Sequence, residues 1–206
     1  MRIPLPKLRE LAEAVRAVFN GPYTTKFPAA VDSVHANFRG LLKFDPDKCI
    51  CCGACTRVCP PRAREIVLDR AKAVLRNVHH AERCIYCGQC VLYCTVGDAI
   101  THTTEFDASR TERSGDWATS VEREAAVCER CGEPFAAKAH LEWIALRVGD
   151  LVSANPTLFL TRYRSLGVAE PAMPAPAGRT PYRSDSLRIL CPECRRKASL
   201  REEWGY

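Results

Sequence analysis

A tandem repeat of cysteines between residues 49 and 94 constrains this chain of 206 residues more than any other feature of its sequence. Each copy has the spacing C-x₂-C-x₂-C-x₃-C, and Cys49 recurs 35 residues later as Cys84. The repeated cysteines are Cys49, Cys52, Cys55 and Cys59 in the first copy and Cys84, Cys87, Cys90 and Cys94 in the second. The chain must therefore form two equivalent cysteine loops from neighbouring segments.

The cysteine content indicates metal ligands rather than disulfides. The chain has 13 cysteines, which is an odd number. Its first ten residues interrupt every apolar run with a charge or a proline, which is not typical of a secretory signal peptide. Thiols stay reduced in proteins that are not exported, so these cysteines are expected to bind metals. No apolar stretch approaches the ~18 residues that a membrane-spanning helix needs, so we expect no transmembrane segment.

The spacing of the repeat is the signature of proteins that hold two [4Fe–4S] clusters. Three closely spaced thiolates bind one face of a cubane. The fourth cysteine lies too far around to complete that set and binds the other cluster. Cross-ligation therefore assigns Cys49, Cys52, Cys55 and Cys94 to one cluster and Cys84, Cys87, Cys90 and Cys59 to the other. The alternative is that the same eight cysteines bind zinc.

Full ligation by cysteine leaves no open iron for a substrate. Such clusters transfer electrons and carry out no bond chemistry, so we expect no catalytic residue in this chain. Cys51 lies beside a complete ligand set and is expected to be a passive small residue. Thr95 replaces the proline that follows Cys59 in the first copy, a change expected to affect the exit turn and not the ligation. The apolar residues placed to shield the clusters from water are Ile50, Val58, Ile85 and Val91.

A second group of cysteines forms two C-x₂-C knuckles far apart in the sequence. The four residues are Cys128 and Cys131, then Cys191 and Cys194. Such knuckles suit tetrahedral Zn²⁺, because each tight turn brings two sulfurs to one ion and frees N–H groups to bond them. We expect a structural zinc or mononuclear iron site; the alternatives are a further iron–sulfur cluster and a redox-active pair. The histidines lack ligand-like spacing to these cysteines and are expected at the surface or in packing: His35, His79, His80, His102 and His140.

The N-terminal residues 1–40 are predicted to form a helix followed by an arm. Residues 5–19 place apolar side chains at helical intervals between charged ones, which predicts an amphipathic helix that ends at Asn20-Gly21-Pro22. The arm from Tyr23 to Gly40 lacks sustained periodicity. The helix can pack on its own domain, dock on a partner or lie at a membrane surface. We expect residues 1–40 to dock the chain on a partner.

Residues 41–106 hold the repeat and are predicted to form the cluster-binding domain. Short strand-like runs flank each copy, at residues 41–44, 66–68, 73–75 and 99–101. Asp69-Arg70-Ala71-Lys72 is predicted to turn the middle two runs into a hairpin. Residues 107–127 are polar and charged, which predicts a linker.

Residues 128–206 are predicted to form a helical extension around the second cysteine group. Helical spacing covers residues 136–152, and Asn155-Pro156 is suited to start a second helix. Four prolines within residues 169–181 predict an exposed, semi-extended loop. The predicted fold class is α+β: a pseudo-symmetric two-[4Fe–4S] ferredoxin-like domain with an N-terminal helix and arm and a C-terminal Cys₄ extension.

The metal sites are expected to compensate the positive net charge. The chain has 30 Lys and Arg against 24 Asp and Glu, which gives +6. Two thiolate-ligated clusters contribute about −4 and a Cys₄ zinc site about −2, which brings the sum to about zero. The basic balance is therefore weak support for a nucleic-acid partner, although Arg162, Arg164 and Arg195-Arg196-Lys197 could form a local patch. We expect no nucleic-acid partner.

These motifs resemble those of a known family of iron–sulfur subunits. Asn37-Phe38-Arg39-Gly40 followed by the tandem cysteine motifs resembles the two-cluster subunit of respiratory NADH–quinone oxidoreductase (complex I) and of related membrane-bound hydrogenases. The segment 22–28 looks like the arm that those subunits lay across a neighbour. Cys128-Glu-Arg-Cys131-Gly-Glu-Pro134-Phe135-Ala136 with Cys191-Pro192-Glu193-Cys194-Arg195 is similar to the C-terminal extension of the formate hydrogenlyase iron–sulfur subunit, which the quinone-oxidoreductase subunit lacks.

The resemblance implies an electron relay in a cytoplasmic position, peripheral to a complex at the cytoplasmic membrane. Electrons from a ferredoxin-like or dehydrogenase donor would pass through both clusters to the small subunit of a [NiFe] hydrogenase, whose small and large subunits are then partners. A subunit of an NADH–quinone oxidoreductase-type complex is the alternative within this class. Two other classes of protein fit these motifs less well. A zinc-ribbon nucleic-acid-binding protein would show stacked aromatics and a basic stripe, and a radical enzyme needs a cluster with an open iron.

Overall fold

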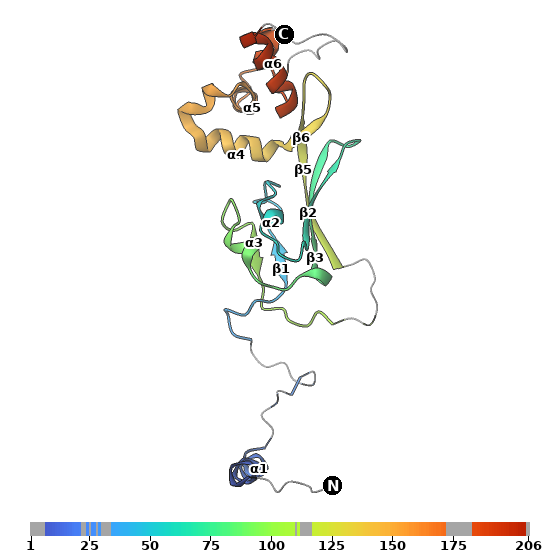
Figure 1. Ribbon diagram of the computed structural model, residues 1–206, viewed down its shortest axis with the longest axis vertical. Coiled ribbons are helices and arrows are strands. Elements are labelled where there is room, and N and C mark those ends of the chain that lie inside the picture. The colour runs from blue at the N-terminus through green and yellow to red at the C-terminus, as the bar shows by residue number, and fades with distance from the viewer. Residues whose placement is uncertain are drawn as a thin grey trace. The chain divides into compact units, whose positions relative to one another are not determined.

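The computed structural model describes residues 7–21, 24, 26–27, 29, 34–109, 111, 117–171 and 183–204. The chain has two compact units, Met1–Ala36 and Asn37–Tyr206. Helix α1 (Leu8–Asn20) lies in the first unit, and every other helix and strand labelled in Figure 1 lies in the second. The proline-rich stretch and much of the predicted arm lie outside the described residues.

The predicted amphipathic N-terminal helix is confirmed. Helix α1 begins at Leu8 and ends at Asn20, where Gly21 takes a positive φ of 75° that stops the helix. The backbone N–H of Lys7 donates to the Glu10 carboxylate and so satisfies one free donor at the helix start. Helix α1 buries none of its residues. Among the described residues, no helix is both long and apolar enough to span a bilayer.

The second unit contains two antiparallel sheets (Figure 1). Strands β1 (Leu42–Phe44) and β4 (Ile100–His102) form the smaller sheet, and β2 (Arg64–Asp69), β3 (Val74–His80), β5 (Ala118–Val127) and β6 (Pro134–Ala137) form the larger one in that order. The strands predicted beside the cysteine loops are confirmed. Strands β2 and β3 form the predicted hairpin, in which the Asp69 carboxylate accepts a hydrogen bond from the Lys72 N–H.

The two cysteine loops share one backbone conformation. Each leads into a one-turn helix, α2 (Ala54–Arg57) or α3 (Gln89–Leu92). Gly53 and Gly88, which are 35 residues apart, cap these helices at φ values of 80° and 79°. Cys51 and Tyr86, also 35 residues apart, have φ values of 51° and 53°. The repeat in the sequence is therefore a repeat in the fold, as predicted for the cluster-binding domain.

The segment predicted as a linker contains the longest strand of the larger sheet, and this corrects the prediction for residues 118–127. Strand β5 pairs along β3 from Ala118 to Glu124 and then with β6. Val121, Ala125 and Ala126 are buried, while the charged residues between them face solvent or pair across strands. Arg76 of β3, for example, contacts Glu122 of β5. The polar composition belongs to one face of a half-buried strand.

The C-terminal extension is helical, as predicted. Its helices are α4 (Lys138–Val148), α5 (Pro156–Ser165) and α6 (Pro192–Trp204), and its 3₁₀ turns are η3 (Gly149–Ala154) and η4 (Arg183–Leu187), while η1 (Ala81–Arg83) follows β3. The Asn155 side chain caps α5 by accepting from the N–H groups of Thr157 and Leu158, and Pro156 occupies the first helical position. The helices α4 to α6 gather at the β6 end of the larger sheet (Figure 1).

Cysteines make up much of the buried core. One cluster packs Cys49 and Cys51 with Leu75, Val121 and Ala125, and a second packs Cys55 and Cys90 with Leu42 and Ile100. A third, in the extension, consists of Cys128, Leu190, Cys191, Cys194 and Ala198. Metal-binding domains with few apolar side chains depend on the metal for stability, so the fold and its sites are expected to form together.

Substituting Gly40 is expected to destabilise the cluster-binding unit. A Cβ at Gly40 would overlap the backbone carbonyl oxygens of Glu105 and Thr103, which close the ladder between β1 and β4. Because the obstacle is backbone, we expect Gly40→Ala to cost about 2 kcal/mol of unfolding free energy. The measurement is the thermal unfolding midpoint of the anaerobically purified protein. Thr101→Ala, on the exposed face of β4, is the control; equal midpoints for the two variants would contradict the prediction.

Candidate metal centres

Two cavities are lined by the repeated cysteines. The first cavity is lined by Cys49, Cys52, Cys55 and Cys94, and the second by Cys59, Cys84, Cys87 and Cys90. Each has about 290 Å³ of space between its atoms, part of which is open to solvent. The fold thus brings three cysteines of one copy together with the last cysteine of the other copy. This is the grouping that cross-ligation requires; the ligand assignment itself stays a prediction.

The cysteine loops direct backbone N–H groups at the sulfurs. The N–H of Ala63 donates to Cys59 Sγ at 3.2 Å, and the N–H of Tyr86 donates to Cys84 Sγ at 3.4 Å. The positive φ angles of the loops make such turns possible, because they point successive N–H groups inward. Donors of this kind stabilise thiolates, which are the form that binds iron.

Polar side chains add further donors around the first cavity. Asn77 Nδ2 lies 3.6 Å from Cys49 Sγ and 3.4 Å from Cys55 Sγ, and the Thr95 hydroxyl lies 3.1 Å from Cys52 Sγ. A hydrogen bond from Cys51 is the largest effect that lowers the pKa of Cys49 to about 6, and Asn77 contributes to the same shift against the effect of burial. Thr95, which stands in place of a proline, therefore contacts a sulfur of the first cavity.

Two basic side chains lie against the second cavity. Arg64 is 3% exposed and His79 is 2% exposed. The Arg64 Nη1 and Nη2 atoms and the His79 Nε2 atom have no hydrogen-bond partner within the described chain. Burial lowers the pKa of His79 to about 4, and the positive charge of Arg64 adds to this shift, so the imidazole is neutral at pH 7. A buried, unpaired guanidinium is costly unless an anion lies beside it.

The residues around both cavities fit a [4Fe–4S] cluster. Four sulfur donors in each cavity complete the ligand set of a cubane. The unpaired guanidinium of Arg64 and the N–H donors directed at sulfur suit a group with net negative charge. Ile50 lines the first cavity and Ile85 the second, but Ile85 is 61% exposed, so shielding from water is less complete there.

The segment before β1 contacts the second cysteine loop. Arg39 Nη1 donates to the Cys87 carbonyl at 2.9 Å. The ring of Phe38 meets that of Phe106 edge to face, with centroids 6.3 Å apart. These contacts join the segment Asn37-Phe38-Arg39-Gly40 to the second half of the domain. This segment is the motif that contributes to the family resemblance in the sequence.

Cys51 occupies a packing position in the core. Its thiol lies 3.6 Å from the Val121 carbonyl and 3.9 Å from the Leu75 carbonyl, both of which can accept its S–H. The hydrogen bond with Cys49 and, after it, burial raise the pKa of Cys51, so it stays a thiol. Its hydrogen bond to Cys49 lowers the pKa of that thiol, an effect that the sequence does not reveal.

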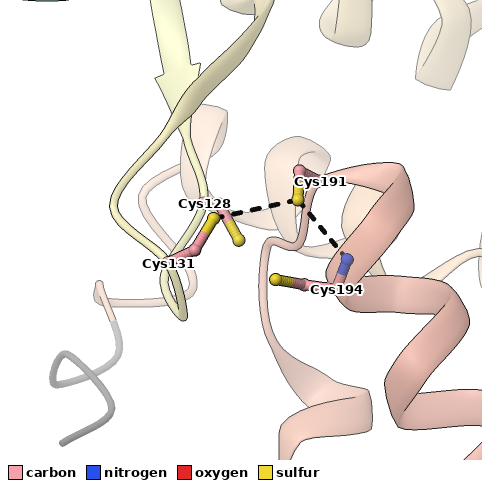
Figure 2. Close-up of side chains that lie close together, drawn as sticks. All are labelled: Cys128, Cys131, Cys191 and Cys194. Carbon is pink, nitrogen blue, oxygen red and sulfur yellow. Dashed lines mark hydrogen bonds between the residues drawn. The ribbon is translucent and has the colours of Figure 1, made fainter. Parts of the chain in front are cut away.

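The four remaining cysteines converge on one point, as Figure 2 shows. Cys128 and Cys131 flank the turn between β5 and β6, Cys191 precedes α6, and Cys194 lies in its first turn. Their sulfur atoms all lie within 4.8 Å of one another, and those of Cys131 and Cys191 are 3.9 Å apart. Zn–S bonds of about 2.3 Å in a tetrahedron place sulfurs about 3.8 Å apart. The donor set therefore fits one tetrahedral zinc or iron ion, whose presence stays a prediction.

A buried hydrogen-bond network holds the second knuckle in place. Arg195 Nη1 donates to the Ser186 carbonyl at 2.6 Å, and its Nη2 donates to Thr157 Oγ1 at 2.9 Å. Glu129, in the first knuckle, accepts from the Ile189 N–H and forms an ion pair with Arg164 at 2.5 Å. These contacts join α5, the first knuckle and the segment before α6. Arg164 and Arg195, two residues of the predicted basic patch, therefore form contacts within the extension.

The thiols of this site differ in how readily they ionise. Burial opposes ionisation of Cys128, but hydrogen bonds from the backbone N–H groups of Cys131, Cys191 and Arg130 outweigh it and lower its pKa to about 7. Burial and the neighbouring Cys191 raise the pKa of Cys194 to about 12. Such a set needs a cation to hold all four sulfurs as thiolates. Among the described residues, no histidine joins this group of ligand atoms.

Sequence reasoning did not identify the polar residues of the cavity walls. Asn77 and Arg64 lie on strands, in runs that read as ordinary sheet residues. The period of 35 residues was the available signal, because it aligns Arg64 with Ala99 and Asn77 with Leu42. A charged or amide side chain aligned with a small or apolar one marks a difference between the two halves.

The pseudo-symmetric loops and the paired cysteine cavities define a two-cluster iron–sulfur protein, a class that transfers electrons. The family described as 4Fe-4S dicluster domain matches residues 41–95. The chain is 30% identical over 117 residues to NADH-quinone oxidoreductase subunit I 2 of Geobacter metallireducens, a match that covers 53% of this chain and 88% of that protein. The chain belongs to the family of this subunit I, and iron–sulfur clusters are its cofactors.

Two further similarities are to a formate hydrogenlyase subunit and to a solved structure. The chain is 33% identical over 60 residues to formate hydrogenlyase subunit 6 of Escherichia coli, which is 29% of this chain and 33% of that protein. A chain of a membrane-bound sulfane sulfur reductase, an archaeal respiratory membrane complex, is 24% identical with a TM-score of 0.39 and covers 54% of this chain and 60% of that one. The chain thus spans a third of the length of the hydrogenlyase subunit.

Changing Cys128 or Cys191 to Ser is expected to release one metal ion without loss of the clusters. The second cysteine group lies in a core of its own, separate from those around the two cavities. We expect elemental analysis to show one zinc or iron fewer, and residues 128–197 to become sensitive to protease, while dithionite still reduces both clusters. Arg57→Gln, which changes an exposed arginine of α2, is the control and should keep every metal. Loss of both cluster signals in Cys128→Ser would contradict a separate structural site.

Proposed function

We propose that this chain is an electron-transfer subunit of a membrane-bound [NiFe] hydrogenase complex of the formate hydrogenlyase type. In this proposal it receives electrons from a ferredoxin-like or dehydrogenase donor and passes them through two [4Fe–4S] clusters to the hydrogenase small subunit. It sits at the cytoplasmic face, peripheral to the membrane. The observation that carries the relay is the pair of cavities, each of which is lined by three repeated cysteines of one copy and the last cysteine of the other copy.

The proposal assigns the ligands by cavity. Cys49, Cys52, Cys55 and Cys94 hold one cluster, and Cys84, Cys87, Cys90 and Cys59 hold the other. When bound, each cluster supplies reversible one-electron oxidation and reduction. The residues of the chain hold the thiolates, keep them hydrogen-bonded and restrict water. Since all eight sulfurs are used as ligands, the chain binds no substrate at iron and acts only with its partners.

The C-terminal site bears on the choice between two kinds of complex. Its four cysteines, Cys128, Cys131, Cys191 and Cys194, form one compact ligand group. The sequence motifs that contain them resemble the extension of the hydrogenlyase subunit. This supports the hydrogenase complex. The longer match, to a subunit I of NADH-quinone oxidoreductase, supports that type of complex as the second candidate. A hydrogenase large-subunit gene beside this one supports the first candidate, and genes of a quinone-reducing module support the second.

Helix α1 is the proposed docking element. Its apolar residues share one face at helical spacing, and Leu8, Val18 and Phe19 are each at least 80% exposed. A surface of this kind is typical of a contact with another protein or a membrane. The family resemblance favours a neighbouring subunit. We propose that residues 1–40 anchor the chain in its complex.

Metal analysis of the full chain tests the relay. We expect about eight irons and eight acid-labile sulfides in the two clusters after anaerobic reconstitution. Because Cys59 lies in the cavity of the second motif, Cys59→Ala should damage the cluster held by Cys84, Cys87 and Cys90. Electron paramagnetic resonance of the reduced protein reports both clusters, and Arg57→Gln, which changes an exposed arginine of α2, is the control. Four irons in a natively folded chain, or loss confined to the first motif's cluster, would count against the assignment.

Removing the apolar face of α1 is expected to separate the chain from its complex. Deleting residues 1–22, or combining Leu11→Asp with Val15→Asp, should leave both clusters reducible by dithionite because α1 buries no residue. Donor oxidation should no longer produce hydrogen. Arg9→Ala, on the polar face, is the control. A truncated chain that co-purifies with the complex and supports full hydrogen production would refute docking, and loss of the clusters would show that α1 packs on its own domain.

A further inference from the structure

The two cavities are equivalent by the repeat, but one position on their walls differs in charge. The period of 35 residues relates the walls of the second cavity to those of the first. By this period Cys59 corresponds to Cys94, and Arg64 corresponds to Ala99. Both Arg64 and Ala99 line their cavities, and both are nearly inaccessible, at 3% and 2% exposure. One cavity therefore has a buried guanidinium where the other has a methyl group.

Among the described residues, Arg64 has no ion-pair partner for this charge. Its guanidinium carbon lies 4.6 Å from the centre of the Phe44 ring, and its Nη1 and Nη2 atoms have no hydrogen-bond partner within the described chain. Its cross-strand neighbour is His79, which is neutral at pH 7. The aromatic face stabilises a cation only modestly. The unsatisfied N–H groups lie at the wall of a cavity lined by four cysteines.

We infer that Arg64 is a positioning residue whose buried charge raises the reduction potential of the cluster held in the second cavity. Reduction adds one negative charge to that cluster, and a fixed positive charge in a poorly solvated site favours the reduced form. This inference rests on the proposed two-cluster function. It adds that the charge of one side chain contributes to a difference in reduction potential between the two clusters.

The first cavity uses neutral donors instead. Asn77 maps onto Leu42 and Thr95 maps onto Pro60, so the amide and hydroxyl donors are present only on the first side. Neutral donors at 3.1–3.6 Å from sulfur favour negative charge less than a buried unit charge does. Each cavity therefore has its own means of adjusting the potential, and each can be removed separately.

Arg64 lines only the second of the two cysteine cavities, so the effect of its charge is expected to be larger on the cluster held there.

The test is a redox titration of the full, reconstituted chain followed by electron paramagnetic resonance. The variants Arg64→Gln and Arg64→Met remove the charge, Arg64→Lys keeps it, and Asn77→Leu removes the amide of the first cavity. Arg57→Gln, an exposed arginine of α2, is the matched control. We expect Arg64→Gln to lower the equilibrium constant for reduction of one cluster by at least about tenfold, or about 59 mV for one electron. Arg64→Lys should change it less, and Arg57→Gln should change neither cluster.

The assignment comes from comparing two variants. The cluster that shifts in Asn77→Leu is the first one, so the cluster that shifts most in Arg64→Gln must be the other. A shift of the same cluster in both variants, or no shift in Arg64→Gln and Arg64→Met, would overturn the inference. Failure of both charge-removing variants to assemble two clusters would assign Arg64 to assembly and overturn it as well. Iron content below about eight in the unmodified chain would instead count against the proposed function.

Discussion

The exchange of one cysteine between the two halves of the repeat is the constraint on which the rest of the structure depends. Cys59 and Cys94 leave their own loops and line the cavity of the opposite copy. Each cavity therefore combines three repeated cysteines of one copy with the last cysteine of the other. The two loops must therefore lie against each other, and pairing of β1 with β4 closes the unit that holds them. Binding of metal and closure of the fold are then expected to be one event.

Thiolates held close together in a small core repel one another, and nearby hydrogen-bond donors and positive charge offset this repulsion. Backbone N–H groups of the loops, the Asn77 amide and the Cys51 thiol all face sulfur atoms. In the wall of the second cavity, the corresponding group is the positively charged side chain of Arg64. Because donors to sulfur and buried charges both set reduction potentials, the groups that stabilise the sites also decide how they exchange electrons.

The larger sheet connects this domain to the C-terminal extension. Strand β5 runs along β3, next to the cysteine loops, and continues to Cys128, where the second ligand group begins. The knuckle at Cys191 and Cys194 is held by Arg195, which binds carbonyl and hydroxyl oxygens of the extension itself. The extension therefore shares a strand with the cluster-binding domain and has a core of its own. A structural metal there would order the extension without taking part in the relay.

The sequence by itself determined the cysteine repeat, its period, the hairpin between its copies and the helices that flank it, because these follow from local spacing and turn chemistry. Only the tertiary structure decided what lies on the cavity walls. Strand β5 looked like a linker because its charged face hides three buried residues, and a strand of this composition is recognisable only once β3 offers it hydrogen bonds. Nothing in the local sequence indicates that Arg64 is buried, because charged side chains are rarely buried. Its burial depends on a cavity assembled from residues far apart in the chain, and local sequence carries no information about the anions that such a cavity is built to hold.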